Sequence, residues 1–127
     1  MTTGYDERLD PDECRRLLAS RGVARLAFVE ASGDVVVLPV AYTIDGSGLL
    51  VFRTSRDGVL SRLAAGRRVT VQVDDLSEDL RSGWSVLAHG VASRYEGDVS
   101  VEPWVAGHDE LLVAVTVERL SGRAVSA

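Results

Sequence analysis

A two-residue alternation of apolar side chains constrains the fold of this chain more than any other feature. In VARLAFV, residues 23–29, the side chains of Ala24, Leu26 and Phe28 fall on one side of an extended chain, and the intervening residues fall on the other. This period is typical of a half-buried β-strand, because successive side chains of a strand point to opposite faces. The same pattern returns along the chain, with turn residues between its segments, and it therefore predicts a mainly β protein.

Six segments show this strand character. They are VARLAFV, VVVLPVAYTI, LLVFRT, RVTVQVDD, WSVLAHGVASRYE and LLVAVTVERL. SGD at residues 32–34 and DGSG at residues 45–48 predict tight hairpin turns, and Gly90 predicts a bulge or bend in the fifth strand. Neither regular βα alternation nor a glycine-rich nucleotide motif is present. We therefore expect a closed or nearly closed antiparallel barrel of the Greek-key type.

Two short helices are expected beside the strands. Asp10 is suited to cap the first helix, Pro11 suits its first position, and Glu13 completes a capping box. The segment SRDGVLSRLAAG predicts a second helix, with Gly66 at its C-terminal end. Residues 1–9 carry no such signal and are expected to be flexible.

Length and charge limit the function. The 127 residues suffice for a single domain, 1–127, with one core. The net charge of −5 disfavours binding to nucleic acid or to an anionic membrane, since both require a concentrated basic face. The sequence shows no apolar run of membrane-spanning length and no apolar signal segment, so we expect a cytoplasmic protein.

Residue types limit the chemistry further. A single cysteine, Cys14, allows no internal disulfide, and with only two histidines no closed Cys/His zinc site can form, so no metal is expected. All 14 basic residues are arginine, which removes every lysine that could form a Schiff base. Arginine binds phosphate through a planar fork, so anion binding remains available.

The segment RTSR, residues 53–56, is the strongest local constellation of polar groups. It places two guanidiniums and two hydroxyls where a predicted strand leads into a predicted helix, an arrangement that favours a phosphate. In the alternative interpretation, Ser55 or Asp57 only caps the helix and the arginines are solvated. The spacing alone leaves both interpretations open.

Other polar residues carry weaker signals. His89 and His108 lack the neighbours of a catalytic triad, and a structural or solvated role is favoured for both. The pair Asp74 and Asp75 could ligate Mg²⁺, but it is more typical of a turn that ends a strand.

The two tryptophans could stack on a planar ligand or fill the core or an interface. Trp84 is the better ligand candidate, because it follows a polar loop and Gly83. Trp104 lies in an irregular segment, where nothing in the pattern decides between the two roles.

Several of these segments, taken in order, resemble one known family. Over residues 13–123 they are ECRRLLASRGVARLAFV, VVLPVAYTIDG, LLVFRT, RVTVQVDDL, GWSVLAHGVA and SGR. Together they resemble the pyridoxamine 5'-phosphate oxidase-like flavin-binding split-barrel proteins, particularly the short members found in actinobacteria. The resemblance implies a six-stranded split barrel that forms a homodimer.

The resemblance also implies a cofactor and its site. In the family, two FMN molecules lie in grooves between the subunits, with the flavin ring against the second-strand backbone. That arrangement explains a proline within a strand, because the neighbouring peptide groups bond the ligand rather than a full ladder. The implied contacts are Leu38, Pro39 and Val40 for the ring, Arg53, Thr54 and Ser55 for the phosphate, and Trp84 with Ser85 from the partner.

Two positions depart from the family pattern. Val59 stands where many relatives carry a lysine near the start of the crossing helix, so Arg56 or Arg62 is expected to supply the missing charge. Ala41 stands where an asparagine is frequent, which removes one polar contact to the ligand.

We therefore expect an FMN-dependent oxidoreductase that acts on an unknown small molecule. No side chain is expected to act as a general acid or base, because the cofactor carries the chemistry. One alternative is a reductase that uses the 8-hydroxy-5-deazaflavin coenzyme. Another, motivated by Val59, is a non-catalytic dimer that binds flavin or lacks it. Oxidation of pyridoxamine phosphate itself is disfavoured, because the chain is short for that enzyme.

Overall fold

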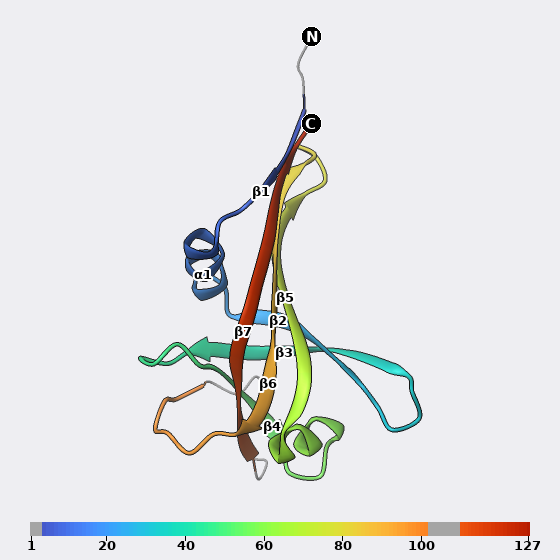
Figure 1. The fold of residues 1–127 in the computed structure, drawn as a ribbon, viewed down its shortest axis with the longest axis vertical. Coiled ribbons are helices and arrows are strands. Elements are labelled where there is room, and N and C mark those ends of the chain that lie inside the picture. The colour runs from blue at the N-terminus through green and yellow to red at the C-terminus, as the bar shows by residue number, and fades with distance from the viewer. Residues whose placement is uncertain (1–3, 102–109) are drawn as a thin grey trace.

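The computed structural model describes residues 4–101 and 110–127, whose strands form one antiparallel sheet that closes into a barrel (Figure 1). The strands are β1 (Tyr5–Arg8), β2 (Val23–Val29), β3 (Val35–Ile44), β4 (Leu50–Ser55), β5 (Arg67–Ser77), β6 (Ser82–Arg94) and β7 (Glu110–Ser126). Their order is β1-β7-β4-β3-β2-β5-β6, and β6 also pairs with β7. Strands β2 to β7 therefore form the six-stranded barrel that the sequence predicts, and β1 adds a seventh strand outside it.

The strand β1 falls in residues 1–9, where the sequence predicted a flexible segment without a strand. Its sequence YDER has no apolar alternation, and all four side chains are exposed. Main-chain pairing holds it instead, because Tyr5–Arg8 lie opposite residues 126–123 of β7. The strand β7 is itself longer than predicted and continues past Leu120 to Ser126, which provides the edge on which β1 pairs.

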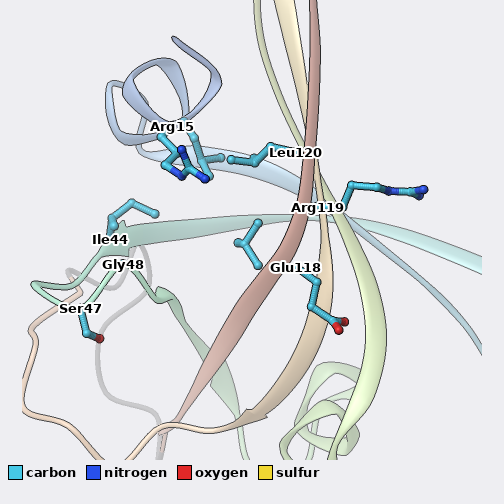
Figure 2. A pocket seen from close by; sticks show the side chains of 9 residues that line it. Arg15, Ile44, Ser47, Gly48, Glu118, Arg119 and Leu120 are labelled. Carbon is cyan, nitrogen blue, oxygen red and sulfur yellow. The ribbon is translucent and has the colours of Figure 1, made fainter. Parts of the chain in front are cut away.

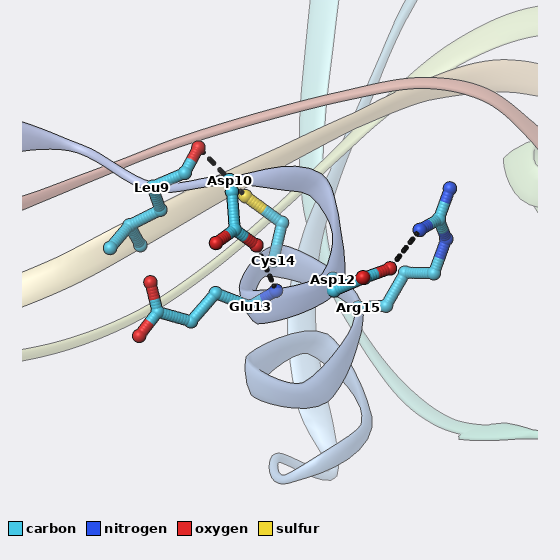
Figure 3. A network of polar contacts seen from close by, with 6 residues as sticks. All are labelled: Leu9, Asp10, Asp12, Glu13, Cys14 and Arg15. Atoms are coloured by element: carbon cyan, nitrogen blue, oxygen red, sulfur yellow. Dashed lines mark hydrogen bonds and ion pairs between the residues drawn. The ribbon is translucent and has the colours of Figure 1, made fainter.

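The helix α1 (Pro11–Ala19) begins as predicted. The carboxylate of Asp10 accepts a hydrogen bond of 2.8 Å from the main-chain N–H of Glu13, and Pro11 opens the first turn (Figure 3). The Glu13 carboxylate pairs with Arg16 at 3.2 Å instead of accepting from the Asp10 N–H, so only half of the predicted capping box forms. The helix buries Cys14 and Leu18 against the barrel, and burial raises the pKa of the Cys14 thiol, so it stays protonated at neutral pH.

The second predicted helix is a short 3₁₀-helix, η1 (Val59–Ala65), and Leu63 is its buried residue. None of the helices in the described part of the chain is long and apolar enough to cross a membrane.

The predicted alternation and turns are confirmed. Ala24, Leu26 and Phe28 are buried in the main core, together with the inward side chains of the other barrel strands. The two predicted hairpin turns contain glycines with positive φ, Gly33 at 91° and Gly48 at 92°, a conformation that side chains other than glycine disfavour. The barrel is therefore specified largely by local signals.

A bulge interrupts the pairing of β6 with β7 at the position that Gly90 predicted. His89 lies opposite Arg119, whereas Gly90 lies opposite Val117, so Glu118 is the extra residue on β7. The irregularity gives the two longest strands the local bend that a small barrel needs.

The strand β3 has an open edge along its first half. Residues 35–41 pair with β2, but β4 pairs only with residues 42–44. Pro39 is exposed within this half, where one side of the strand has no ladder among the described residues. A proline within a strand is expected at an edge, a bulge or a ligand, because it cannot donate to the ladder, and Pro39 lies at an edge.

Stability should fall above about pH 10 because of Tyr42. Its hydroxyl donates to the carbonyl oxygen of Leu18, and burial raises its pKa to about 12. In the unfolded chain Tyr42 ionises near pH 10, so its contribution to the free energy of unfolding is fully present below that pH. This contribution is lost between about pH 10 and 12, at about 1.4 kcal/mol per pH unit.

Urea unfolding at about pH 9 and about pH 11 measures this effect. Because the chain has no lysine, few other groups titrate in that range. The matched variant is Tyr42→Phe, whose stability should change less between the two pH values. An equal loss in both proteins would assign the effect to other groups.

Candidate functional site

Two of the predicted binding segments lie on neighbouring strands where the barrel opens. The pairing of β3 with β4 ends at Tyr42 opposite Phe52. Beyond that pair, residues 38–40 continue along the open edge of β3, while residues 53–55 continue along β7 to the end of β4. The structure thus brings the predicted ring contacts and the predicted phosphate contacts to one end of the barrel.

The side chains of the β3 segment point in alternate directions. Val40 is buried in the barrel core, Leu38 is half-buried and Pro39 is exposed. A ligand at this edge would therefore meet main-chain groups and Pro39, and Val40 would contribute only its backbone.

Arg53 has an acidic partner that the sequence did not predict. Its Nη1 atom lies 2.6 Å from Oε2 of Glu110 at the start of β7. The Arg53 side chain is 33% exposed and that of Glu110 is 17% exposed, so the pair is only partly open to solvent. The Nε atom of Arg53 is buried and has no hydrogen-bond partner among the described residues. One donor of Arg53 thus remains unsatisfied.

The turn after β4 is compact. The Ser55 hydroxyl donates to the Asp57 carboxylate, and the Gly58 N–H donates to the Ser55 carbonyl oxygen at 3.1 Å. Gly58 is the N-cap of η1 and no side chain caps this helix. The interpretation in which Ser55 or Asp57 only caps the helix is therefore wrong.

The local charge fits a phosphate in part. The region holds three arginines, of which Arg56 and Arg62 are exposed, and two acidic residues, Asp57 and Glu110. It is therefore basic by one charge in a chain whose net charge is −5. The unsatisfied Nε of Arg53 and the hydroxyls of Thr54 and Ser55 are suitable donors.

Val59 supplies no charge at this place. Its side chain is partly buried and packs against the main core. Arg62 lies in the last turn of the same helix. Compensation by Arg56 or Arg62 stays a prediction.

Trp84 and Ser85 lie at the opposite end of the barrel from Arg53. On β7, Arg53 lies opposite Leu112, whereas Trp84 lies opposite Ala124. Twelve residues of extended chain span about 40 Å. Trp84 is only partly buried and packs against the main core. The two halves of the predicted site therefore do not meet within one copy of the chain.

The remaining polar candidates have structural partners. Thr70 Oγ1 lies 2.9 Å from His89 Nδ1 across β5 and β6. The Oδ2 atom of Asp74 lies 3.7 Å from Nη1 of Arg25, and the Oδ2 atom of Asp75 lies 3.6 Å from Nη1 of Arg21. No group of three or more possible metal-ligating side chains occurs in residues 4–101 and 110–127. Trp104 and His108 lie outside the described residues.

Sequence reasoning missed a pocket of about 380 Å³ that contains none of the predicted site residues (Figure 2). It lies between α1, the turn of β3 and β4, and β7. Ile44 and Leu120 point into it, whereas Arg119 points to the other side of β7. Because three remote segments form it, no local pattern could have indicated it.

Comparison with known proteins agrees with this architecture. The profile of the pyridoxamine 5'-phosphate oxidase family matches residues 10–124. An uncharacterized protein of Mycobacterium tuberculosis, Rv0080, is 32% identical in an alignment of 124 residues that covers 90% of this chain and 82% of that protein.

Two solved structures share the fold. The FAD binding protein from Mycobacterium smegmatis has a TM-score of 0.74 at 24% identity, covering 94% of this chain and 98% of its own. An FAD-binding protein from Mesorhizobium loti has a TM-score of 0.77 at 21% identity, covering 98% of this chain and all of its own. With the profile match over most of its length, this chain belongs to the pyridoxamine 5'-phosphate oxidase-like family.

Proposed function

We propose that this protein is a flavin-dependent oxidoreductase that binds FMN between two copies of the chain and acts on a small molecule in the cytoplasm. The observation that carries the proposal is the open edge of β3 beside the end of β4, where main-chain groups adjoin Arg53 and two hydroxyls. Membership of the family supports it, and so do the two solved structures described as FAD binding.

The residues present divide the work of binding. Arg53, Thr54 and Ser55 hold the phosphate, with Arg56 or Arg62 adding charge, and the backbone of residues 38–40 orients the ring. A bound flavin supplies hydride or electron transfer, which no side chain of this chain provides on its own. The protein positions the ring and limits its access to water.

A symmetric dimer completes the site, because Trp84 and Ser85 are too far from Arg53 within one copy. The outer face of the hairpin of β2 and β3 also carries Val29, Val35 and Val37, which are 57%, 66% and 55% exposed. Three neighbouring valines in water are unfavourable, so their burial against a second copy supports the dimer.

Two observations favour a second function, a dimer that binds flavin without catalysis or lacks flavin. Arg53 already pairs with Glu110, and Val59, which stands where the family pattern implies a lysine, packs against the core. Both features weaken phosphate binding. The deazaflavin coenzyme remains an alternative ligand for the same groove.

A visible absorption spectrum of the purified protein tests the proposal. We expect flavin bands in the protein as isolated, or after addition of FMN and removal of excess ligand. A colourless protein that binds none of FMN, FAD or the deazaflavin coenzyme would contradict the proposal and support the flavin-free dimer.

Replacing Trp84 with alanine should weaken FMN binding about tenfold, because an aromatic contact with the flavin is lost. The apo protein should lose only a few degrees of melting temperature, since Trp84 is only partly buried in the core. Fluorescence titration and thermal unfolding measure the two effects. Extensive unfolding with unchanged affinity in the surviving fold would show that Trp84 is a core residue alone.

A further inference from the structure

Residues 95–101, the strap, follow β6 and cover the outer face of β4 and β7. Together they form a second, small core on that face. Its buried residues are Val51, Val101 and Ala114, and the residues packed against them are Leu49, Tyr95, Val99 and Leu112. The neighbours of Val51 on β4, Leu50 and Phe52, belong to the main core, so Val51 faces away from the barrel interior.

Arg53 lies on this same outer face, beside the small core. It is two residues from Val51 along β4, so both side chains point to the same side of the sheet. Leu112, which packs against the small core, is directly opposite Arg53 on β7. The Cβ atoms of such a pair are about 5 Å apart. The small core therefore borders the stem of Arg53, whose Nε atom is buried.

Two hydrogen bonds of Tyr95 hold the strap to the sheet. Its main-chain N–H donates to the carbonyl oxygen of Leu112 at 2.9 Å, and its hydroxyl donates to Oδ2 of Asp45 at 3.0 Å. Asp45 is itself fixed, because its Oδ1 atom accepts from the N–H groups of Ser47 and Leu49, both at 2.9 Å. Desolvation raises the pKa of the Tyr95 hydroxyl, and the Ser47 hydroxyl lowers the pKa of the Asp45 carboxyl, so a neutral phenol donates to a carboxylate at neutral pH.

Gly97 allows the strap to fold back over the Tyr95 ring. A Cβ atom at position 97 would lie 2.2 Å from the hydroxyl oxygen of Tyr95 and 2.3 Å from its Cζ atom. A larger residue there would push the phenol away from Asp45. The hydrogen bond between Tyr95 and Asp45 therefore depends on the absence of a side chain at position 97.

We propose that Tyr95 and Asp45 are positioning residues for Arg53. Their hydrogen bond holds the strap on the outer face, and the strap holds the Arg53 side chain in the orientation that receives a phosphate. An arginine that is ordered before the ligand arrives loses less conformational entropy on binding. The inference rests on the proposed function for the identity of the ligand, whereas the ordering of Arg53 is a property of the flavin-free protein.

Hydrogen exchange of the Arg53 Nε–H, followed by NMR, tests this ordering without flavin. The signal is identified by its loss in Arg53→Ala. Exchange should be slow in the parent protein, because the atom is buried, and about tenfold faster in Tyr95→Phe, the effect of one lost hydrogen bond on a local opening. Tyr5→Phe is the matched control, since Tyr5 is an exposed tyrosine of β1, and it should exchange like the parent protein.

Fluorescence titration connects the ordering of Arg53 to ligand binding. Tyr95→Phe should bind FMN about three- to tenfold more weakly than the parent protein, because the ligand must then order Arg53 itself. Riboflavin lacks the phosphate and should bind to both proteins alike. This difference between the two ligands separates a positioning role from a purely structural one.

Gly97→Ala provides a second variant in which the Tyr95 hydroxyl is retained. It should reproduce the faster exchange and the weaker FMN binding, because the new methyl group displaces the phenol from Asp45. Its control is Gly46→Ala, where a Cβ atom meets nothing within 4 Å, and this variant should match the parent protein.

Two results would overturn the inference. One is an equal exchange rate of the Arg53 Nε–H in Tyr95→Phe and the parent protein. The other is an FMN affinity in Tyr95→Phe that is unchanged, or that falls by the same factor as the affinity for riboflavin. A parent protein that binds no FMN would contradict the proposed function, and the exchange rates would still decide whether Tyr95 orders Arg53.

Discussion

Replacing Gly90 with alanine should lower the free energy of unfolding by about 3 kcal/mol or more. A Cβ atom at this position would lie 2.0 Å from the Thr116 carbonyl oxygen and 3.1 Å from the Cα atom of Val117. Both atoms belong to the backbone of β7, so no side-chain rotation relieves the clash. The strands β6 and β7 would have to separate at the bulge, where their register shifts.

Urea unfolding of Gly90→Ala against Gly46→Ala measures this cost. Gly46 lies in the turn between β3 and β4, and a Cβ atom there meets nothing within 4 Å. The Gly46 variant should stay within about 0.5 kcal/mol of the parent protein. Equal unfolding midpoints for the two variants would mean that β6 and β7 separate at the bulge at a lower cost in stability than the close approach indicates.

Replacing Arg53 with alanine should weaken FMN binding by about ten- to a hundredfold, because charged hydrogen bonds contribute about 1.5–3 kcal/mol. Replacing its partner should have the opposite effect. In Glu110→Gln, the carboxylate no longer competes with the phosphate for Arg53, so FMN should bind more tightly. Fluorescence titration with FMN should show a loss of affinity in Arg53→Ala and a gain in Glu110→Gln.

Riboflavin is the control ligand for both variants, because it lacks the phosphate. Its affinity should hardly respond to either substitution. Equal losses for riboflavin and FMN in Arg53→Ala would assign Arg53 to the ring or to the fold. Unchanged FMN affinity in Glu110→Gln would show that the ion pair does not compete with the ligand.

The parts of the fold that the sequence predicted depend on local signals. The alternation in residues 23–29, the start of α1 at Asp10 and the bulge at Gly90 each arise within a few residues. The edge position of Pro39 is also local, because a residue without an N–H avoids a fully paired ladder. These features explain why the barrel could be predicted.

Contacts between distant residues account for what the sequence could not provide. Arg53 and Glu110 are 57 residues apart, and nothing near either one indicates the other. The strand β1 is held by main-chain bonds to β7 and has no apolar pattern of its own. The pocket of about 380 Å³ combines α1, the turn of β3 and β4, and β7, so it becomes visible only after folding.

The central claim is that each flavin site takes Arg53 from one copy of the chain and Trp84 from the other. Mixing the Arg53→Ala and Trp84→Ala variants tests it most directly. Each variant alone forms a dimer with two defective sites. A mixed dimer instead has one site with both defects and one site with neither.

The measurement is FMN bound per dimer, by native mass spectrometry after the two variants are mixed and allowed to exchange subunits. The shared-site account predicts mixed dimers that carry one tightly bound FMN, at an FMN concentration where neither parent variant retains any. If mixed dimers form and bind no more FMN than the two variants do separately, Arg53 and Trp84 do not share a site, and the account is contradicted.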